Sequence, residues 1–362
     1  MSNSVFQSVI VQLKEVSEHT FGVIDAEGSV VSCTDASLLG ERWADAALKV
    51  GSATGSIVTF GQKCFKAIVG NSNFYEYAVF CSGEDDSAKN MCTMAYIALN
   101  DAKVFYEEKH VRGTFVKNII MDNILPGDIY IRAKELHFST DVPRAVFLIR
   151  QVGRTDVSTV DVLMGMFPDK LQDFVLSINE TDIAIVKQIT DTTPSEELEK
   201  LAQSVETTLK NELRIKTSIG IGTVAEHLRE LADSYKEAQT AIEVGKVFDT
   251  EKSIMRYENL GIGRLIYQLP TTLCEIFLGE VFKKNSIDSL DQETLFTINK
   301  FFENNLNVSE TSRKLFVHRN TLVYRLEKIK KLTGLDLRQF DHAIVFKVAL
   351  MVRKYLTSRE AR

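Results

Sequence analysis

The segment Asn307–Gly334 constrains the chain most strongly, because two short helical patterns follow each other there with only a few residues between them. The first pattern covers about Val308–Leu315, with Asn307 or Ser309 available as its N-cap. The second covers about Asn320–Thr333 and stops at a glycine, which suits a left-handed C-cap. Two helices in this arrangement predict a helix-turn-helix, whose second helix enters the DNA major groove.

The spacing of apolar and basic residues in this segment supports the prediction. Leu322, Leu326 and Ile329 fall at i, i+4 and i+7, so they form one buried stripe along the second helix. From Ser309 to Lys331 the chain has seven Lys or Arg and two Glu, a net +5 on a chain whose formal net charge is −6. A basic island on an acidic chain suits phosphate neutralisation. The alternative is an ordinary helical hairpin with a solvated basic face.

Residues Leu315–Leu337 also carry a family resemblance. They read LFVHRNTLVYRLEKIKKLTGLDL and resemble the C-terminal DNA-binding domain of the PucR/CdaR family of bacterial transcription regulators. The stretch HRNTLVYRLEKI is similar, more distantly, to the recognition helix of Fis-type proteins. One departure is Phe316, which stands where many helix-turn-helix motifs have a turn glycine and leaves the geometry of the turn open.

The start of the second helix is the expected reader of DNA sequence. We predict that His318 and Arg319 reach base edges, because Arg to guanine is the commonest specific pairing. Thr321, Tyr324 and Arg325 are expected to bind phosphate, which positions the protein without reading sequence. The candidate DNA-binding residues are His318, Arg319, Asn320, Thr321, Tyr324, Arg325 and Lys328.

Length and composition bound the remaining possibilities. A chain of 362 residues, 44% hydrophobic and 25% charged, predicts a soluble globular protein of two to three domains. We find neither an apolar run long enough for a membrane span nor a signal peptide. Five widely spaced cysteines without a CxxC pair indicate reduced thiols in a cytoplasm, and the scattered histidines indicate no metal site. We therefore expect a cytoplasmic protein without a cofactor.

Residues 1–84 predict a ligand-sensing domain with mixed helices and strands. The expected elements are a helix (Val5–Glu18), a hairpin (Phe21–Ile24, Ser29–Cys33), a short helix (Gly40–Val50) and three strands (Ser56–Phe60, Lys63–Val69, Phe74–Cys81). This order favours a PAS- or profilin-like α+β sensor fold. The stretch VIDAEGSVVSCTDASLLGERWADA also resembles the N-terminal sugar-diacid recognition domain of the CdaR branch, which implies an organic acid as effector.

A sensor for an organic acid needs cationic groups at a mostly apolar cavity. Arg42, next to the only tryptophan, Trp43, is the first candidate; alternatively, Arg42 is a surface residue and Trp43 a core residue. Lys63 and Lys66 lie three apart, so a regular strand points them to opposite faces and at most one reaches the cavity. The candidate ligand-binding residues are Arg42, Trp43, Ser32, Thr34 and Lys63.

Residues 85–138 predict a long helical linker. A seam of mostly small residues recurs there at steps of four and three: Ala88, Cys92, Ala95, Leu99, Ala102 and Tyr106. Such a seam permits close helix–helix approach in a dimer coil. The alternative is that it packs against the sheet of its own sensor domain. The following stretch, KNIIMDNILPGDIYIRAKELHF, is again close to the CdaR family.

Residues 139–257 predict a GGDEF-like α/β domain. TSIGIGTVAEHLRELADSYKEAQTAI resembles the end of a GGDEF-type domain, and the expected order of elements agrees. Where that family carries Gly-Gly-Asp/Glu-Glu-Phe on a hairpin, this chain reads Ile178-Asn179-Glu180-Thr181-Asp182. Cyclase chemistry needs the glycines so that a nucleotide can approach the backbone, and an acid at the turn to hold a metal. We therefore expect a degenerate, non-catalytic domain.

The rest of the chain predicts helices. Residues 258–289 form a helical connector with a break at Pro270 and offer a second candidate dimer surface. Residues 290–362 form the all-α helix-turn-helix domain, whose first helix has Asp291 or Ser289 as its cap. Its last helix is expected over Asp341–Leu356, with an apolar face made by Ile344, Val345, Val348 and Val352.

These features together predict a multidomain transcription regulator, not an enzyme. We expect it to bind a double-stranded DNA operator as a homodimer, to respond to a small organic acid, and to have no membrane segment. A second interpretation is a nucleotide-binding or cyclase-like signalling protein that uses the GGDEF-like domain. A non-specific DNA binder of the Fis type would leave the acidic upstream domains unexplained.

Overall fold

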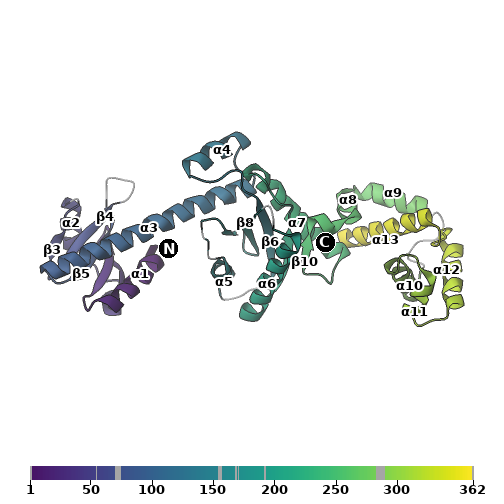
Figure 1. The fold of residues 1–362 in the computed structure, drawn as a ribbon, viewed down its shortest axis with the longest axis horizontal. Helices are drawn as coiled ribbons and strands as arrows, with labels where there is room; N and C mark the ends of the chain where they lie inside the picture. Colours follow the sequence, from purple (N-terminus) through teal and green to yellow (C-terminus); the bar gives the residue numbers. More distant parts are fainter. Residues whose placement is uncertain are drawn as a thin grey trace. The chain divides into compact units, whose positions relative to one another are not determined.

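The chain folds into two compact units, Met1–Phe115 and Val116–Arg362, drawn in Figure 1. The structure, a computed structural model, describes residues 2–53, 55–69, 75–153, 157–167, 169, 171–190, 193–282 and 290–360. No helix among these residues is long and apolar enough to cross a membrane.

The first unit is built on an antiparallel sheet with the strand order β2-β1-β5-β4-β3. Its elements are α1 (Ser2–Val16), β1 (Phe21–Asp25), β2 (Val30–Cys33), α2 (Ala44–Ser52), β3 (Val58–Phe60), β4 (Lys63–Val69), β5 (Tyr75–Ser82) and the start of α3 (Asp86–Ile120). This is the order of elements that the sequence predicts, with boundaries moved by a few residues. Phe74, the expected start of the last strand, lies outside the described residues.

Strand alternation divides the apolar residues of this unit between the two faces of the sheet. On β4, Cys64 and Ile68 pack with α1 and α3, while Phe65 and Ala67 pack with α2. The hairpin β1–β2 turns at Gly28, whose φ of 87° suits glycine. Both faces of the sheet are therefore covered.

The small-residue seam of α3 packs against its own sheet. Ala88, Cys92, Ala95 and Leu99 are fully buried in the core that α1 and the sheet also form. For these four residues the interpretation of the seam as a dimer coil is therefore wrong, and its alternative holds. Small residues permit close approach to any partner, and here the partner is the sheet. The helix also runs without interruption through Gly113.

The second unit begins with a sheet of mixed direction in the order β10-β9-β6-β8-β7. Its elements are α4 (Pro126–Glu135), β6 (Arg144–Val152), α5 (Thr159–Met166), β7 (Phe174–Ser177), β8 (Asp182–Gln188), α6 (Ser195–Leu213), β9 (Lys216–Ile221), α7 (Leu231–Phe248) and β10 (Ile254–Arg256). The sequence interpretation misses α4 and β10. Proline at the first position favours a helix start, and Pro126 opens α4.

Two glycines on β9 let α7 lie close to the sheet. A Cβ atom added at Gly220 would stand 2.0 Å from the carbonyl oxygen of Ala238, and one at Gly222 would stand 2.0 Å from that of Ser234. Close backbone approach of this kind explains glycine inside a strand. The pattern Gly-Ile-Gly therefore serves helix–sheet packing.

The C-terminal part of this unit is helical. It contains α8 (Ile262–Gln268), α9 (Thr271–Val281), α10 (Gln292–Glu303), α11 (Val308–Lys314), α12 (Arg319–Thr333) and α13 (Phe340–Glu360). The predicted break at Pro270 is confirmed, because this residue caps α9. Asp291 caps α10 through its side chain, and Ser289 lies outside the described residues.

The apolar face predicted for the last helix is partly wrong. Of the four expected residues only Val352 is buried, and Ile344 is 43% exposed. The buried face of α13 consists of Ala343, Phe346, Ala349, Val352 and Tyr355. This face serves two neighbours, since Phe346 packs with the helix-turn-helix core and Tyr355 with α7, α8 and α9. Local periodicity cannot anticipate a helix that packs against two separate cores.

Candidate DNA-binding surface

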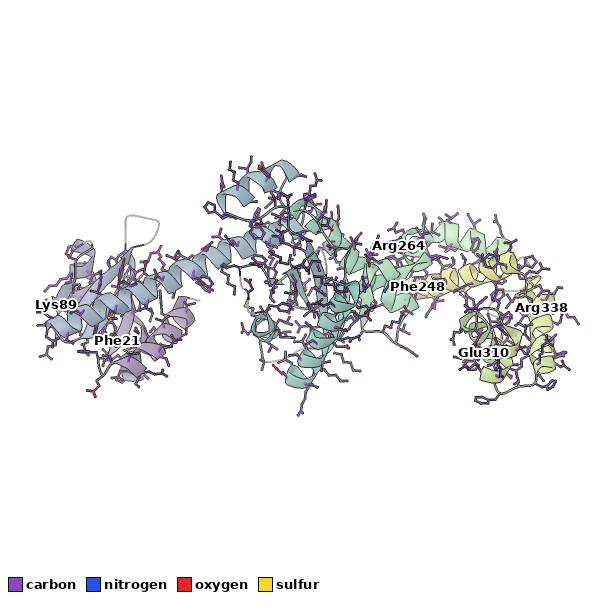
Figure 2. All side chains as sticks on the ribbon, viewed as in Figure 1. Phe21, Lys89, Phe248, Arg264, Glu310 and Arg338 are labelled. Atoms are coloured by element: carbon purple, nitrogen blue, oxygen red, sulfur yellow. The ribbon has the colours of Figure 1, made fainter. Side chains whose placement is uncertain are left out.

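The pair α11–α12 is defined by local hydrogen bonds at its ends. The Asn307 side chain caps α11 by accepting from the backbone N–H of Glu310 at 3.0 Å. His318 caps α12, because its Nδ1 accepts from the backbone N–H of Asn320 at 3.2 Å. Gly334 ends α12 with a φ of 78°, as its sequence position predicts. Figure 2 shows the side chains of this domain, with Glu310 labelled on α11.

The buried stripe of α12 holds the pair against the rest of the domain. Leu322, Leu326 and Ile329 are at most 1% exposed and share one core with α10 and α13. The predicted stripe is therefore confirmed. The outer side of α12 and its cap then remain open to solvent, and the exposed residues there include His318, Arg319, Asn320, Thr321, Tyr324 and Lys328.

Ion pairs divide the seven basic residues of segment 309–331 into two groups, and the structure describes all of this segment. Four of them face a carboxylate within 4.0 Å: Arg313–Glu310, Arg325–Glu293, Lys328–Asp291 and Lys330–Asp336. Within the segment, Lys314, Arg319 and Lys331 form no ion pair. The exposed guanidinium at the start of α12 is therefore available to a ligand.

Arg325 differs from the other predicted DNA-binding residues. Its guanidinium donates to Glu293 Oε1 at 2.5 Å and to Thr297 Oγ1 at 3.1 Å, both on α10, and its side chain is only 27% exposed. The structure thus uses Arg325 to join α12 to α10. The sequence alone predicts a phosphate contact for Arg325. It cannot predict the contact with Glu293, because Glu293 lies 32 residues away and comes close only in the folded domain.

Comparison with known proteins identifies this region. Residues 294–352 match the PucR C-terminal helix-turn-helix domain, and residues 122–244 match the GGDEF-like domain. The chain therefore carries the helix-turn-helix and the GGDEF-like domain that are found in the PucR/CdaR family of transcription regulators. It is a DNA-binding regulator that carries the family's helix-turn-helix.

Named relatives support this assignment. The regulator is 21% identical to the "Carbohydrate diacid regulator" of Escherichia coli (strain K12), over 97% of this chain and 98% of that protein. It is 26% identical to the "Purine catabolism regulatory protein" of Bacillus subtilis (strain 168), over 43% of this chain and 29% of that protein. It is 30% identical to the "Proline-responsive transcriptional activator PutR" of the same organism, over 38% of this chain and 34% of that protein.

Three of the predicted ligand-binding residues meet at one cavity of the N-terminal domain. The cavity has a volume of about 390 Å³, and Arg42, Trp43 and Lys63 line it. Lys63 Nζ lies 4.8 Å from the centre of a Trp43 ring. Arg42 pairs with Glu27 at 3.3 Å, and both side chains are mostly exposed, so solvent competes for this ion pair.

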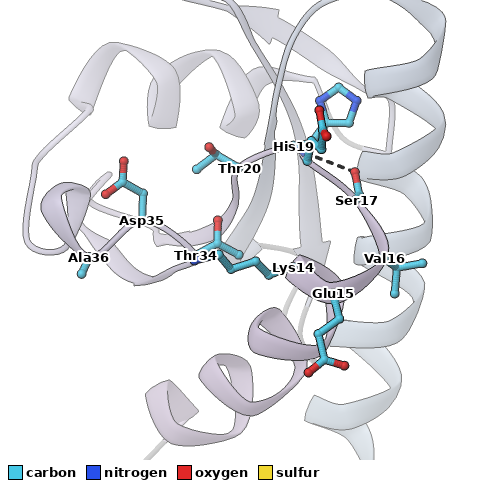
Figure 3. Close-up of a pocket in the computed structure, with 10 residues that line it drawn as sticks. Lys14, Glu15, Val16, Ser17, His19, Thr20, Thr34, Asp35 and Ala36 are labelled. Atoms are coloured by element: carbon cyan, nitrogen blue, oxygen red, sulfur yellow. Dashed lines mark hydrogen bonds between the residues drawn. The ribbon is translucent and has the colours of Figure 1, made fainter.

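The other two predicted residues lie elsewhere. Ser32 is fully buried, and its hydroxyl donates to Gln7 Oε1 on α1. Thr34 accepts from the backbone N–H of Phe21 and lies at a separate cavity together with Lys14 and Asp35 (Figure 3). The structure therefore places neither residue with Arg42. The residues are close in sequence, but Ser32 packs against α1 and Thr34 pairs with Phe21, so neither lies at the Arg42 cavity.

Two aromatic residues of the Arg42 cavity are absent from the predicted set. Phe60 and Phe65 line it together with Lys63. Alternation along β4 would have found Phe65, because positions 63 and 65 share one face of the strand. The same rule places Lys66 on the other face, where its Nζ lies 4.5 Å from the Tyr96 ring centre. The expectation that only one of these lysines reaches the cavity is confirmed.

The hairpin β7–β8 of the GGDEF-like domain is closed by a side chain where the active family has glycines. Asn179 Oδ1 accepts from the backbone N–H groups of Thr181 at 2.9 Å and Asp182 at 2.8 Å. Arg150 on β6 then holds Asp182 through two hydrogen bonds of 2.8 and 2.9 Å, and also binds Glu243 on α7. The acid next to this turn is thus already neutralised by the protein.

Arg150 also sets the ionisation of its main partner. Burial alone would raise the pKa of the Asp182 carboxyl, but the hydrogen bonds and the charge of Arg150 outweigh burial and hold this pKa below its ordinary value. Only 6% of the Asp182 side chain is exposed, so little water can replace the guanidinium. The ion pair therefore contributes to stability at neutral pH.

Replacing Arg150 with methionine should lower the free energy of unfolding by about 3–5 kcal/mol at pH 7, because it leaves Asp182 charged and buried. Because the pKa of Asp182 is lower in the folded than in the unfolded chain, this stabilisation is fully present above the pKa of the unfolded chain, about 4. It is lost as the pH falls through the pKa of the folded chain. The difference in free energy of unfolding between the variant and the wild type should therefore shrink as the pH falls below about 4. Urea unfolding followed by circular dichroism measures both effects.

A matched control removes an exposed ion pair of the same unit. Lys236 and Asp122 lie 2.7 Å apart, with side chains 54% and 61% exposed. Lys236→Met should change stability by about 1 kcal/mol or less. Equal losses in the two variants would contradict a structural role for the Arg150 cluster.

Proposed function

We propose that the regulator binds a small organic acid in the Arg42 cavity and that this acid controls its binding to DNA. The observation that carries the proposal is that Arg42 and Lys63 line one cavity of about 390 Å³ together with aromatic side chains, a size suited to a small ligand. The name of the carbohydrate diacid relative, which aligns over nearly the whole chain, supports the same chemical class.

The lining of the cavity fits a carboxylate. A carboxylate that leaves water needs a cation, and the planar guanidinium of Arg42 can take it through two hydrogen bonds. The Lys63 ammonium supplies a second positive charge, while Phe60 and Phe65 give the lining apolar surface. Asp45 also lines the cavity and can accept from a hydroxyl of the same ligand. One acid group and neighbouring hydroxyls are the chemistry that this set favours.

We propose a PAS- or profilin-like fold for the sensor. The antiparallel order β2-β1-β5-β4-β3, with α1 and α3 on one face and α2 on the other, supports that label. The helix α3 follows the last strand directly, and its inner residues belong to the sensor core. An acid that alters the sheet therefore acts on α3 without an intermediate element, provided that it binds one arrangement more tightly.

On the DNA side we propose that His318 and Arg319 reach base edges and that Asn320, Thr321, Tyr324 and Lys328 contact the backbone. Their exposure on one side of α12 and its cap supports this proposal. Arg325 acts through α10, since Glu293 and Thr297 hold its guanidinium. Its contribution to binding is then the position of α12, not a phosphate contact.

We propose that the GGDEF-like domain is not a cyclase and that the protein acts in the cytoplasm, where its DNA target is. The Asn179 turn and the Arg150–Asp182 ion pair support this reading, because they fill the place of the glycines and of a free acid. A nucleotide-dependent signalling enzyme, the alternative, would need both the glycines and a free acid at this hairpin. The domain serves instead as the connection between sensor and helix-turn-helix.

We propose a homodimer, and α8 and α9 supply the surface that favours it. The inner residues Ile266 and Cys274 are buried against α7 and α13. The outer residues are also apolar and lie open to solvent: Ile262, Leu265, Leu273 and Ile276 are between 48% and 62% exposed. Helices that are apolar on both faces are normally buried on both, so a second copy of the chain is the expected cover.

The outer face of α3 is the competing surface. Its exposed apolar residues Met94, Ile97, Val104 and Val111 lie three or seven residues apart and so fall on one face of the helix. Asp101 and Glu108 occupy the positions between them, so a parallel coil would place like charges opposite each other at two core positions. This repulsion favours the α8–α9 face as the dimer surface.

Binding of an acid should be visible through the only tryptophan, Trp43, because it lines the cavity. Arg42→Ala and Lys63→Ala should each raise the Kd for the acid by about tenfold or more, as expected for the loss of one charge-assisted hydrogen bond. Tryptophan fluorescence and calorimetry on the full chain, with a panel of sugar diacids and short dicarboxylates, measure this change.

Lys66→Ala is the matched control, because Lys66 lies on the opposite face of the same strand. It should bind the acid as the wild type does. If no acid of the panel binds, or if Arg42→Ala and Lys66→Ala bind equally well, the cavity assignment is wrong. The DNA-binding function does not depend on this result.

A further inference from the structure

Phe316 occupies the turn between α11 and α12 in an unusual conformation. Its φ is +55°, in the left-handed region that disfavours residues with a side chain. The backbone around it ends α11 in a Schellman arrangement, with Val317 N–H donating to Ser312 O at 3.0 Å and Phe316 N–H donating to Arg313 O at 3.1 Å. Glycine is the usual residue at this position of the motif.

The phenylalanine ring adds nothing to the folded core. It is 96% exposed, whereas its neighbours Leu315 and Val317 both pack in the core of the domain. An exposed ring gains no burial, and the left-handed backbone carries strain, so the fold alone would be better served by glycine. Two independent observations, the strained φ and the exposure, thus point to a role outside the fold.

The location of Phe316 indicates what the ring meets. It lies two residues before His318, the cap of α12, and the first residues of a recognition helix are those that enter the major groove. Apolar side chains read DNA there by contact with the methyl group of thymine. We propose that Phe316 is a DNA-contacting residue that packs on a thymine methyl beside the base read by Arg319. The proposal rests on the helix-turn-helix and is independent of the ligand and of the dimer.

The test uses the full chain and an operator selected by the wild type from random-sequence DNA. Phe316→Gly should keep or raise the thermal midpoint, because glycine accepts the left-handed backbone. The same variant should bind the operator about five- to tenfold more weakly, the scale of one lost base contact. Phe316→Tyr retains the ring and should bind within about twofold of wild type, less than one lost base contact.

Uracil in place of thymine isolates the methyl group. At the contacted position the substitution should weaken the wild type by the same factor as Phe316→Gly, and should cause no further loss in that variant. Thymines in the operator are replaced one at a time to find this position. No position with such coupling, or a lower thermal midpoint in Phe316→Gly, would overturn the proposal.

A second variant controls for the backbone change. Asn305 also has a left-handed φ, +50°, and is exposed in the turn between α10 and α11. Asn305→Gly should leave operator affinity unchanged. Unchanged operator binding by Phe316→Gly would also overturn the proposal and would point to a protein partner for the ring.

Discussion

Replacing Arg319 with alanine should remove most of the sequence preference of the regulator. A base contact by arginine is worth about 1–3 kcal/mol, which corresponds to a change in Kd of about fivefold to over a hundredfold. Arg319 is exposed at the start of α12 and has no ion-pair partner among the described residues of its segment, so its guanidinium is free to reach a guanine. Operator affinity should therefore fall, while affinity for random DNA changes little. Fluorescence anisotropy at one fixed salt concentration measures both.

Lys331→Ala is the matched control for charge. Lys331 is exposed near the C-terminal end of α12 and also forms no ion pair within segment 309–331. Its loss should weaken operator and random DNA to the same extent, as expected for a non-specific electrostatic contribution. If Arg319→Ala behaves like this control, Arg319 does not read a base.

The helices around Arg319 are predictable from sequence because their signals are local. The caps Asn307 and His318 bond to backbone groups two or three residues away, and Gly334 lies directly after the last turn. The stripe Leu322–Leu326–Ile329 follows from helical spacing alone. None of these features needs knowledge of another part of the chain.

The partners of individual side chains are not local, and there the sequence interpretation fails. Arg325 finds Glu293 through the packing of α12 on α10, and Ser32 finds Gln7 through the packing of α1 on the sheet. The α3 helix carries apolar residues on two faces, and periodicity cannot say which face its own sheet covers. The inner face is covered, which is why the small-residue seam packs in the core of its own sensor domain.

Charging the outer face of α8 and α9 should convert the regulator to a monomer. Leu265 and Ile276 are 62% and 59% exposed, so glutamate at both positions leaves the fold of one chain intact. In a dimer the same four charges would be buried without partners, which is strongly unfavourable. Light scattering at micromolar concentration should therefore give the mass of one chain, 40.7 kDa, with an unchanged thermal midpoint.

The same double variant should lose operator binding by about a hundredfold or more, because two linked helix-turn-helix domains gain that much from effective concentration. Binding to a single half-site should stay unchanged, since Arg319 and the rest of α12 are untouched. The comparison of the two DNAs separates loss of dimerisation from damage to the DNA-binding surface.

The control places the same charges on α3. Ile97 and Val104 are each 53% exposed. The double variant Ile97→Glu with Val104→Glu should leave the dimer intact if Asp101 and Glu108 already prevent the α3 faces of two chains from meeting. A monomer from the α3 variant together with a dimer from the α8–α9 variant would reverse the assignment. Because each pair changes two exposed apolar residues to glutamate, the result depends on which face is covered and not on the number of charges added.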